Sequence, residues 1–160
     1  MAEERGMKGQ ARVIGFLNDY LQIELAGHKQ YLLAAATFDR WGLGKLREAQ
    51  QAYAREETEH AAVILRRILF LEGAPNLADA CAVRSPASVE EQLRRDQALV
   101  TRAIVHLREA VTYAAAVKDD GSRVLFERML VDEEKHLHWL EVQLGLLGGL
   151  GEKHYLQSQI

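Results

Sequence analysis

The apolar residues of this chain recur every three or four positions through four long segments. That period is typical of amphipathic α-helices, each with one face turned toward a core. The apolar residues that show this spacing, in chain order, are Leu17, Leu21, Leu25 and Leu32; Tyr53, Ile64, Ile68 and Leu71; Val89, Leu93, Val100, Ala103, Leu107 and Ala114; and Phe126, Met129, Leu140, Leu144 and Leu147. A last amphipathic piece, Lys153 to Gln159, predicts a short fifth helix after Gly148-Gly149. The pattern therefore predicts an all-α fold.

The breaks between these segments differ in length, and the lengths predict the topology. Trp41–Gly44 and Asp119–Ser122 are short enough to make the helices on either side antiparallel neighbours. Both prolines lie in one longer stretch, Ala74–Ser88, whose end is marked by a capping box formed by Ser88 and Glu91. A helix of about 26 residues is roughly 40 Å long and 15 extended residues span about 50 Å, so this stretch can cross the whole bundle. Two short turns and one long crossover predict a ferritin-like four-helix bundle.

Composition and charge change this picture little, but they exclude some classes of function. The length of 160 residues predicts one domain, 1–160. A net charge of -3 gives no electrostatic reason to expect a nucleic-acid partner. The first residues lack the apolar region of a signal peptide, and no apolar run approaches the ~18 residues of a membrane span. A cytoplasmic location without a membrane partner is expected, and the single cysteine, Cys81, is assigned no role.

Acidic and imidazole side chains interrupt the apolar stripes where a core should be. The second segment carries Glu57 and His60 in line with its apolar residues, the fourth carries Glu133 and His136 in the same spacing, and the first contributes Glu24. Buried carboxylates without a partner are costly, and no Lys or Arg lies on these stripes to pair with them. Carboxylate oxygens with imidazole nitrogens and no thiolate suit iron, manganese or zinc, and bridging carboxylates suit two metal ions.

An internal repeat sharpens this prediction. The two Glu-x-x-His pairs are 76 positions apart, so the two halves of the bundle are related by that shift. The counterpart of Glu24 should then lie at position 100, which is Val100. The ferritin-like di-iron scheme has one Glu from each of two helices and Glu-x-x-His from the other two, so one of its four carboxylates is missing here. A single Glu-x-x-His arises easily by chance, and a residual site that no longer binds metal is the alternative.

Other residues with side chains of chemical interest receive ordinary structural interpretations. His106 and His138 fall off the inward stripes and are expected at the surface. Trp41 and Trp139 are expected to serve as packing anchors.

The sequence is similar to the bacterioferritins over nearly its whole length. The segments that carry the resemblance are Asn18–Glu24, Gln30-Tyr31, Trp41-Gly42, Arg67–Asn76, Leu107–Ala110, Asp132–His136 and Tyr155–Gln157. The resemblance implies a hollow shell of 24 subunits that oxidises Fe(II) with oxygen at di-iron sites inside each subunit, stores ferric mineral and carries haem at two-fold interfaces. It also implies that His154 and Gln157, in the short fifth helix, line a four-fold channel.

The resemblance assigns a role to each of the five candidate ligands. Glu24 and His60 would be terminal ligands of one iron, and His136 a terminal ligand of the other. Glu57 and Glu133 would bridge the two ions. Val100 stands where the second iron's terminal carboxylate belongs, so we expect an asymmetric site whose second position is impaired. Asp96 lies one helical turn away, about 5–6 Å along the axis, too far to substitute directly.

The haem position departs from the family as well. The family's axial methionine would directly follow the glutamate of the second helix, and Thr58 occupies that place. The surrounding outward positions, where a haem pocket needs hydrophobic residues, are Gln51, Arg55, His28 and Lys29. No bound haem is therefore expected. A smaller departure is Ala52, where some family members have a histidine.

Two functions remain open at this point. In the first, the subunit is a ferroxidase and iron store, as five of the six expected ligands favour. In the second, it is a mainly structural subunit that co-assembles with a catalytic, haem-binding bacterioferritin paralogue, as Val100 and Thr58 favour. A DNA-binding mini-ferritin is disfavoured because no basic tail is visible. Outward apolar residues such as Leu25 and Leu32 predict a homo-oligomer or a mixed oligomer in either case.

Overall fold

The computed structural model describes residues 7–78 and 82–160, which form four long helices and one short helix, as the apolar pattern predicts. The helices are α1 (Ala11–Arg40), α2 (Gly44–Phe70), α3 (Val89–Ala116), α4 (Asp120–Leu150) and α5 (Glu152–Ser158). Cys81 lies outside the described residues. None of the helices in the described part of the chain combines the length and apolar character that crossing a membrane requires.

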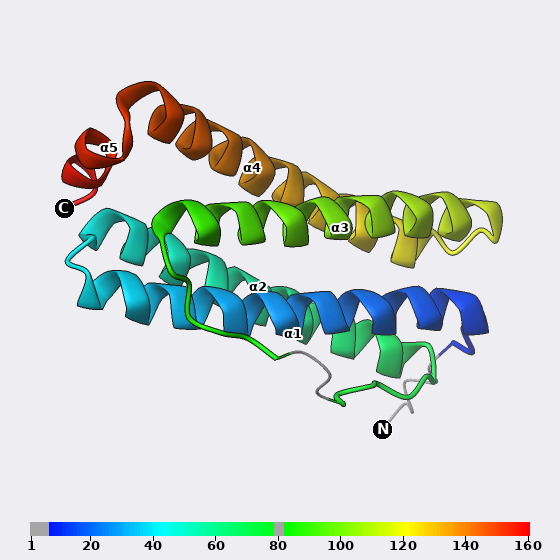
Figure 1. Cartoon of the computed structure of the whole chain (residues 1–160). Helices are drawn as coiled ribbons and strands as arrows, with labels where there is room; N and C mark the ends of the chain where they lie inside the picture. Colours follow the sequence, from blue (N-terminus) through cyan, green and yellow to red (C-terminus); the bar gives the residue numbers. More distant parts are fainter. Residues whose placement is uncertain (1–6, 79–81) are drawn as a thin grey trace.

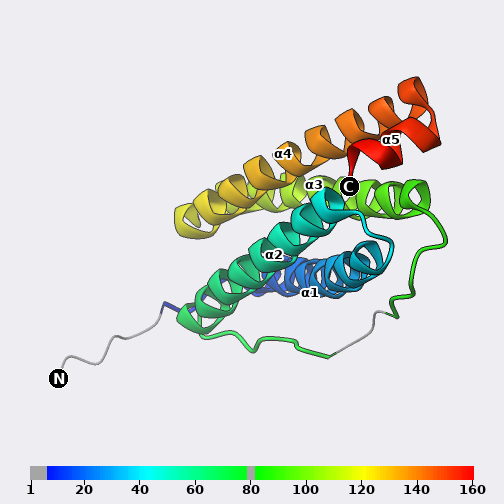
Figure 2. The same ribbon diagram turned by 90° about the vertical axis from the view of Figure 1, so that its left-hand side faces the viewer.

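The long helices form two antiparallel hairpins, α1 with α2 and α3 with α4, and α1 also contacts α3 (Figure 1). The connection between the hairpins leaves α2 after Phe70 and reaches α3 at Val89. Figure 2 shows it passing on the side of α1 and ending at the opposite end of the bundle. The ferritin-like topology with one long crossover is therefore confirmed.

The first part of the crossover is fixed to α1 by polar side chains. Asn18 Nδ2 donates to the Ala74 carbonyl at 3.0 Å, and the Asn76 N–H donates to Asn18 Oδ1 at 2.7 Å. Gln22 Nε2 donates to the Asn76 carbonyl one helical turn further along α1. These bonds set the direction in which the crossover starts.

The predicted capping box before α3 is present in altered form. Ser88 Oγ accepts from the Glu91 N–H at 3.1 Å, as expected. The Glu91 carboxylate, however, accepts from the Ala87 N–H at 2.7 Å and not from the N–H of Ser88. The side chains of Ser88 and Glu91 thus each accept a hydrogen bond from a backbone N–H at the start of α3.

The turn between the hairpin helices α3 and α4 is shorter than predicted. Helix α4 already begins at Asp120, because Asp119 caps it by accepting from the Ser122 N–H at 3.0 Å. Arg67 of α2 pairs with Asp119 at 2.7 Å and donates to Ser122 Oγ at 3.0 Å. A Cβ atom on Gly121 would lie 2.6 Å from Arg67 Nη2, so a larger residue here would displace the guanidinium from Asp119 and Ser122.

The apolar core is divided into two clusters along the bundle axis. One, near the start of α1, includes Leu17, Ile23, Ala61 and Met129. The second cluster lies toward the opposite end of the bundle and includes Ala34, Leu46 and Leu140. On α1, α2 and α4, the stretch between the two clusters holds the buried candidate ligands Glu24, Glu57, Glu133 and His136.

Helix α5 folds back toward the start of α2. Tyr155 is fully buried and its hydroxyl donates to Gln143 Oε1 at 2.9 Å, while the Lys45 N–H donates to the Gln159 carbonyl at 3.0 Å. His154 and Gln157 are exposed on this helix.

The two outward leucines differ in exposure. Leu32 is 55% exposed, as expected, whereas Leu25 is only half-exposed because it packs against the first core cluster. Leu32 therefore supports the prediction of an oligomer more strongly than Leu25 does.

Candidate metal centre

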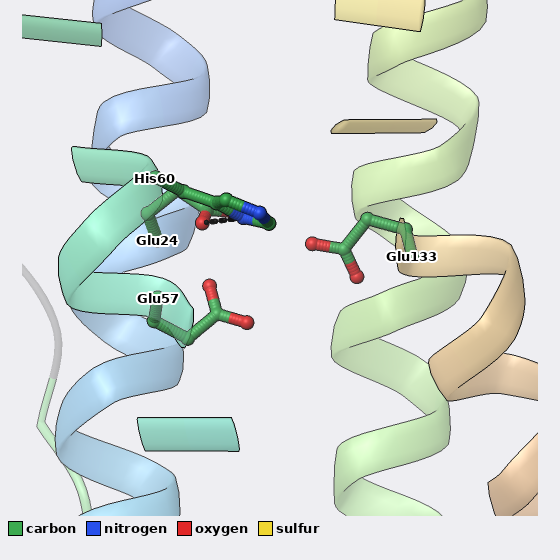
Figure 3. Close-up of side chains that lie close together, drawn as sticks. All are labelled: Glu24, Glu57, His60 and Glu133. Atoms are coloured by element: carbon green, nitrogen blue, oxygen red, sulfur yellow. Dashed lines mark hydrogen bonds and ion pairs between the residues drawn. The ribbon is translucent and has the colours of Figure 1, made fainter. Parts of the chain in front are cut away.

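Four of the five predicted ligands come together between the two core clusters. Glu24 is supplied by α1, Glu57 and His60 by α2, and Glu133 by α4, and one ligand atom from each lies within 4.8 Å of all the others. Figure 3 shows Glu24, Glu57 and His60 on the first hairpin, with Glu133 facing them from α4. The i,i+3 spacing on α2 places Glu57 and His60 on the same inward face.

The hydrogen bonds of the cluster leave one buried carboxylate oxygen without a partner. His60 Nδ1 lies 2.9 Å from Glu24 Oε2, and the Tyr20 hydroxyl donates to Glu133 Oε1 at 2.9 Å. Glu24 is fully buried, yet its Oε1 has no hydrogen-bond partner. A buried carboxylate oxygen without a donor is costly, and a cation would satisfy it.

The electrostatics of the cluster favour a bound cation. Among the described residues, no Lys or Arg is paired with the three carboxylates. Burial raises the pKa of Glu24 and of Glu57 well above the usual range, and it raises the pKa of Glu133 to about 7. The mutual repulsion of these carboxylates adds to the shifts of Glu24 and Glu57. A multivalent cation would reverse this cost by compensating the negative charges.

His136, the fifth predicted ligand, lies outside the four-residue cluster. Its ring stacks on Tyr53 with centroids 3.4 Å apart and an interplanar angle of 12°, and it meets the edge of Tyr31 at 5.3 Å. Burial lowers the pKa of His136 to about 3, so the ring is neutral. Its Nε2 is buried without a hydrogen-bond partner. A neutral imidazole can bind a metal, but aromatic packing determines where this one lies.

The position of the missing carboxylate is apolar. Val100 is 1% exposed and belongs to the second core cluster. Asp96, one turn earlier on α3, is fully buried, and its two oxygens accept from Gln30 and Gln50 at 2.7 Å and from Gln92 at 2.6 Å. Burial raises the pKa of Asp96 to about 6. Both Asp96 oxygens accept hydrogen bonds from glutamine amides, and Asp96 does not belong to the cluster of possible metal ligands.

A second, more open acidic group adjoins the first through His60. Its Nε2 lies 3.3 Å from Asp132 Oδ2 and 3.8 Å from Glu56 Oε1. A 340 Å³ pocket between α2 and α4 is bordered by His60, Asp132 and Met129. Glu56 and Asp132 were not among the ligands that the apolar spacing predicted. Their positions directly before Glu57 and Glu133 were the available signal.

The surface around Thr58 mixes polar and charged side chains with the exposed Leu32. The Thr58 hydroxyl lies 3.1 Å from the Ala54 carbonyl and 3.0 Å from His28 Nδ1. The adjoining 480 Å³ pocket is lined by His28, Leu32, Gln51, Ala54, Arg55, Thr58 and Glu59. A hydroxyl at this place cannot supply the thioether that the resemblance implies for haem, and charged walls suit a porphyrin poorly.

The remaining predictions for single residues have mixed outcomes. His138 is exposed, as expected, but His106 is half-buried and its Nε2 donates to the Phe16 carbonyl at 2.9 Å. Trp139 is half-buried and packs on the second core cluster, as expected of a packing residue. Trp41 is 39% exposed, and its ring contacts Phe38. His106 was misjudged because an off-stripe residue can still face the neighbouring helix.

The bundle and its carboxylate–histidine centre define a ferritin-like protein, and the family model described as "Ferritin-like domain" matches residues 14–149. The chain is 38% identical over 155 residues to a "Bacterial ferritin" of Synechocystis sp., covering 96% of this chain and 99% of that protein. It is 39% identical over 155 residues to a "Bacterial ferritin" of Pseudomonas aeruginosa, covering 96% and 100%. It is 40% identical over 154 residues to a "Bacterioferritin" of Streptomyces coelicolor, covering 96% and 92%. The chain belongs to the bacterioferritin family.

Proposed function

We propose that the chain is a subunit of an iron-storage shell that binds Fe(II) between its two hairpins, oxidises it with oxygen and passes Fe(III) to a stored mineral. The observation that supports this most directly is the cluster of Glu24, Glu57, His60 and Glu133, with a buried oxygen of Glu24 left without a donor. Iron is the substrate here, and oxygen is its oxidant. Hard carboxylate ligands with one imidazole suit Fe(II) and stabilise Fe(III) still more.

The proposed site is asymmetric. Glu24 and His60 serve as terminal ligands of the first iron, and Glu57 and Glu133 bridge toward a second position beside His136. At that position Val100 supplies no oxygen, and the His136 ring is packed against Tyr53. The second Fe(II) therefore binds weakly, and paired oxidation of two ions by oxygen is slow.

Anaerobic Fe(II) titration of the purified oligomer tests this proposal. We expect about one tightly bound Fe(II) per subunit, followed by slow oxidation and core formation when air is admitted. Two tight sites per subunit would contradict the asymmetry. No tight site would contradict iron binding altogether and would favour the structural alternative.

The second candidate function is a mainly structural subunit that co-assembles with a catalytic, haem-binding paralogue. Val100 and Thr58 favour it, because each stands where a family member that oxidises iron or holds haem supplies a ligand. Mixed shells would then show iron oxidation in proportion to the content of the paralogue. Oxidation by the homo-oligomer alone distinguishes the two candidates.

Assembly is part of both candidates. We propose a shell of 24 subunits in which exposed apolar residues such as Leu32 are covered by neighbouring subunits. His154 and Gln157 would line the channel where four copies of α5 meet. Light scattering that found a stable monomer would refute the storage proposal.

A further inference from the structure

Tyr20 reaches from the first hairpin to the ligand supplied by the second. It lies on α1, one turn before Glu24, and is fully buried. Its hydroxyl donates to Glu133 Oε1 at 2.9 Å. Among the four clustered residues, Glu133 is the one that comes from α4, facing Glu24, Glu57 and His60 across the space between the hairpins (Figure 3).

The ring of Tyr20 is held firmly behind its hydroxyl. It belongs to the first core cluster, and it stacks on His106 of α3 with centroids 6.3 Å apart and an interplanar angle of 14°. His106 is itself fixed by donating from Nε2 to the Phe16 carbonyl at 2.9 Å. A phenol has only two side-chain torsions, so this packing fixes the position of its hydroxyl.

We propose that Tyr20 is a positioning residue of the proposed iron site, holding the Glu133 carboxylate in the orientation that serves the iron beside Glu24 and His60. The hydrogen bond orients Oε1 of Glu133 and occupies one of its lone pairs, so both carboxylate oxygens can still bind a cation. This inference rests on the proposed function. The Tyr20 hydrogen bond matters more here than in a complete site, because Val100 provides no second carboxylate from the α3–α4 hairpin to hold a cation.

The test is anaerobic Co(II) titration of the assembled protein and its Tyr20→Phe variant, followed through the visible absorption of bound Co(II). Losing a hydrogen bond to a metal ligand typically weakens metal affinity 10- to 100-fold, and we expect a loss of this size together with an altered Co(II) spectrum. Tyr155→Phe is the matched control, because it removes the hydroxyl of another buried tyrosine, which lies in α5 and donates to Gln143 of α4. That control should leave affinity and spectrum unchanged.

A double-mutant cycle separates positioning from a general loss of structure. If Tyr20 acts through Glu133, adding Tyr20→Phe to Glu133→Ala, which removes the acceptor of the Tyr20 hydrogen bond, should weaken Co(II) binding less than twofold beyond Glu133→Ala alone. Additive losses would overturn the proposal, as would wild-type affinity and spectrum in Tyr20→Phe. If the unaltered protein binds no Co(II), the proposed function fails as well, an outcome that titration of the unaltered protein reveals by itself.

Discussion

Replacing Val100 by glutamate tests whether the missing carboxylate limits iron binding. Val100 is 1% exposed in an apolar cluster that includes Leu93, Ile104 and Leu140, so without metal the new carboxylate would be buried with no partner. Burying an unpaired charge costs several kcal/mol even after relaxation. We take about 3 kcal/mol, which at roughly 2–4 °C per kcal/mol for a chain of this size lowers the melting temperature by about 6–12 °C.

Metal should reverse this loss. Changes in the outer surroundings of a metal already alter its affinity 10- to 100-fold, so a new direct ligand should tighten the second position by at least about 100-fold. Anaerobic Fe(II) titration would then rise from about one toward two ions per subunit, and oxidation in air would become faster. Calorimetry with Zn(II), which is not oxidised, would show the melting temperature of Val100→Glu restored.

Val100→Gln is the control, because it has nearly the same size and no charge. It should lower the melting temperature less than Val100→Glu, and it should leave the Fe(II) stoichiometry near one. The reasoning is refuted if the unaltered protein already holds two tight ions, or if Val100→Glu and Val100→Gln bind Fe(II) alike. Either result would mean that charge at position 100 does not determine occupation of the second position.

Three further predictions concern other parts of the molecule. Because burial raises the pKa of Asp96 to about 6, its folded form retains a proton that the unfolded chain releases, and stability from this residue falls as pH rises from about 4 to 7. Relative to Asp96→Asn, the unaltered protein should therefore lose about 3 kcal/mol of unfolding free energy over that range in urea titrations, and parallel curves would contradict this. The homo-oligomer with Thr58 should show no Soret band after expression with excess haem; a bis-methionine haem spectrum would refute the prediction. Gly121→Ala should destabilise by about 1–3 kcal/mol because its Cβ meets Arg67, whereas Gly145→Ala, with open space around it, should not lower the melting temperature, as thermal unfolding would show.

The helices and their order could be predicted because each is signalled locally. Apolar spacing, the proline-containing crossover and the cap at Ser88 depend on residues near one another in sequence, and the structure retains all three. The boundary at Asp119 was misplaced because its capping role also depends on Arg67, which is distant in the chain. Local spacing carries no information on such a partner.

The candidate site shows the same division. Spacing along one helix predicts which residues share a face, and it correctly placed Glu57 with His60. It cannot predict side-chain torsions or contacts between hairpins. His136 lies three positions after Glu133 yet turns its ring onto Tyr53, and Tyr20 could not be assigned before its bond to Glu133 was known.

The polar bonds that fix the crossover to α1 have a consequence for the handedness of the whole bundle. The second hairpin could cover the apolar face of the first with α3 beside either α1 or α2, so burial alone does not choose between the two arrangements. Asn18 holds Ala74 and Asn76 on α1, and the chain then passes α1 and brings α3 beside it. Two asparagines outside the core thus favour the arrangement in which α3 lies beside α1.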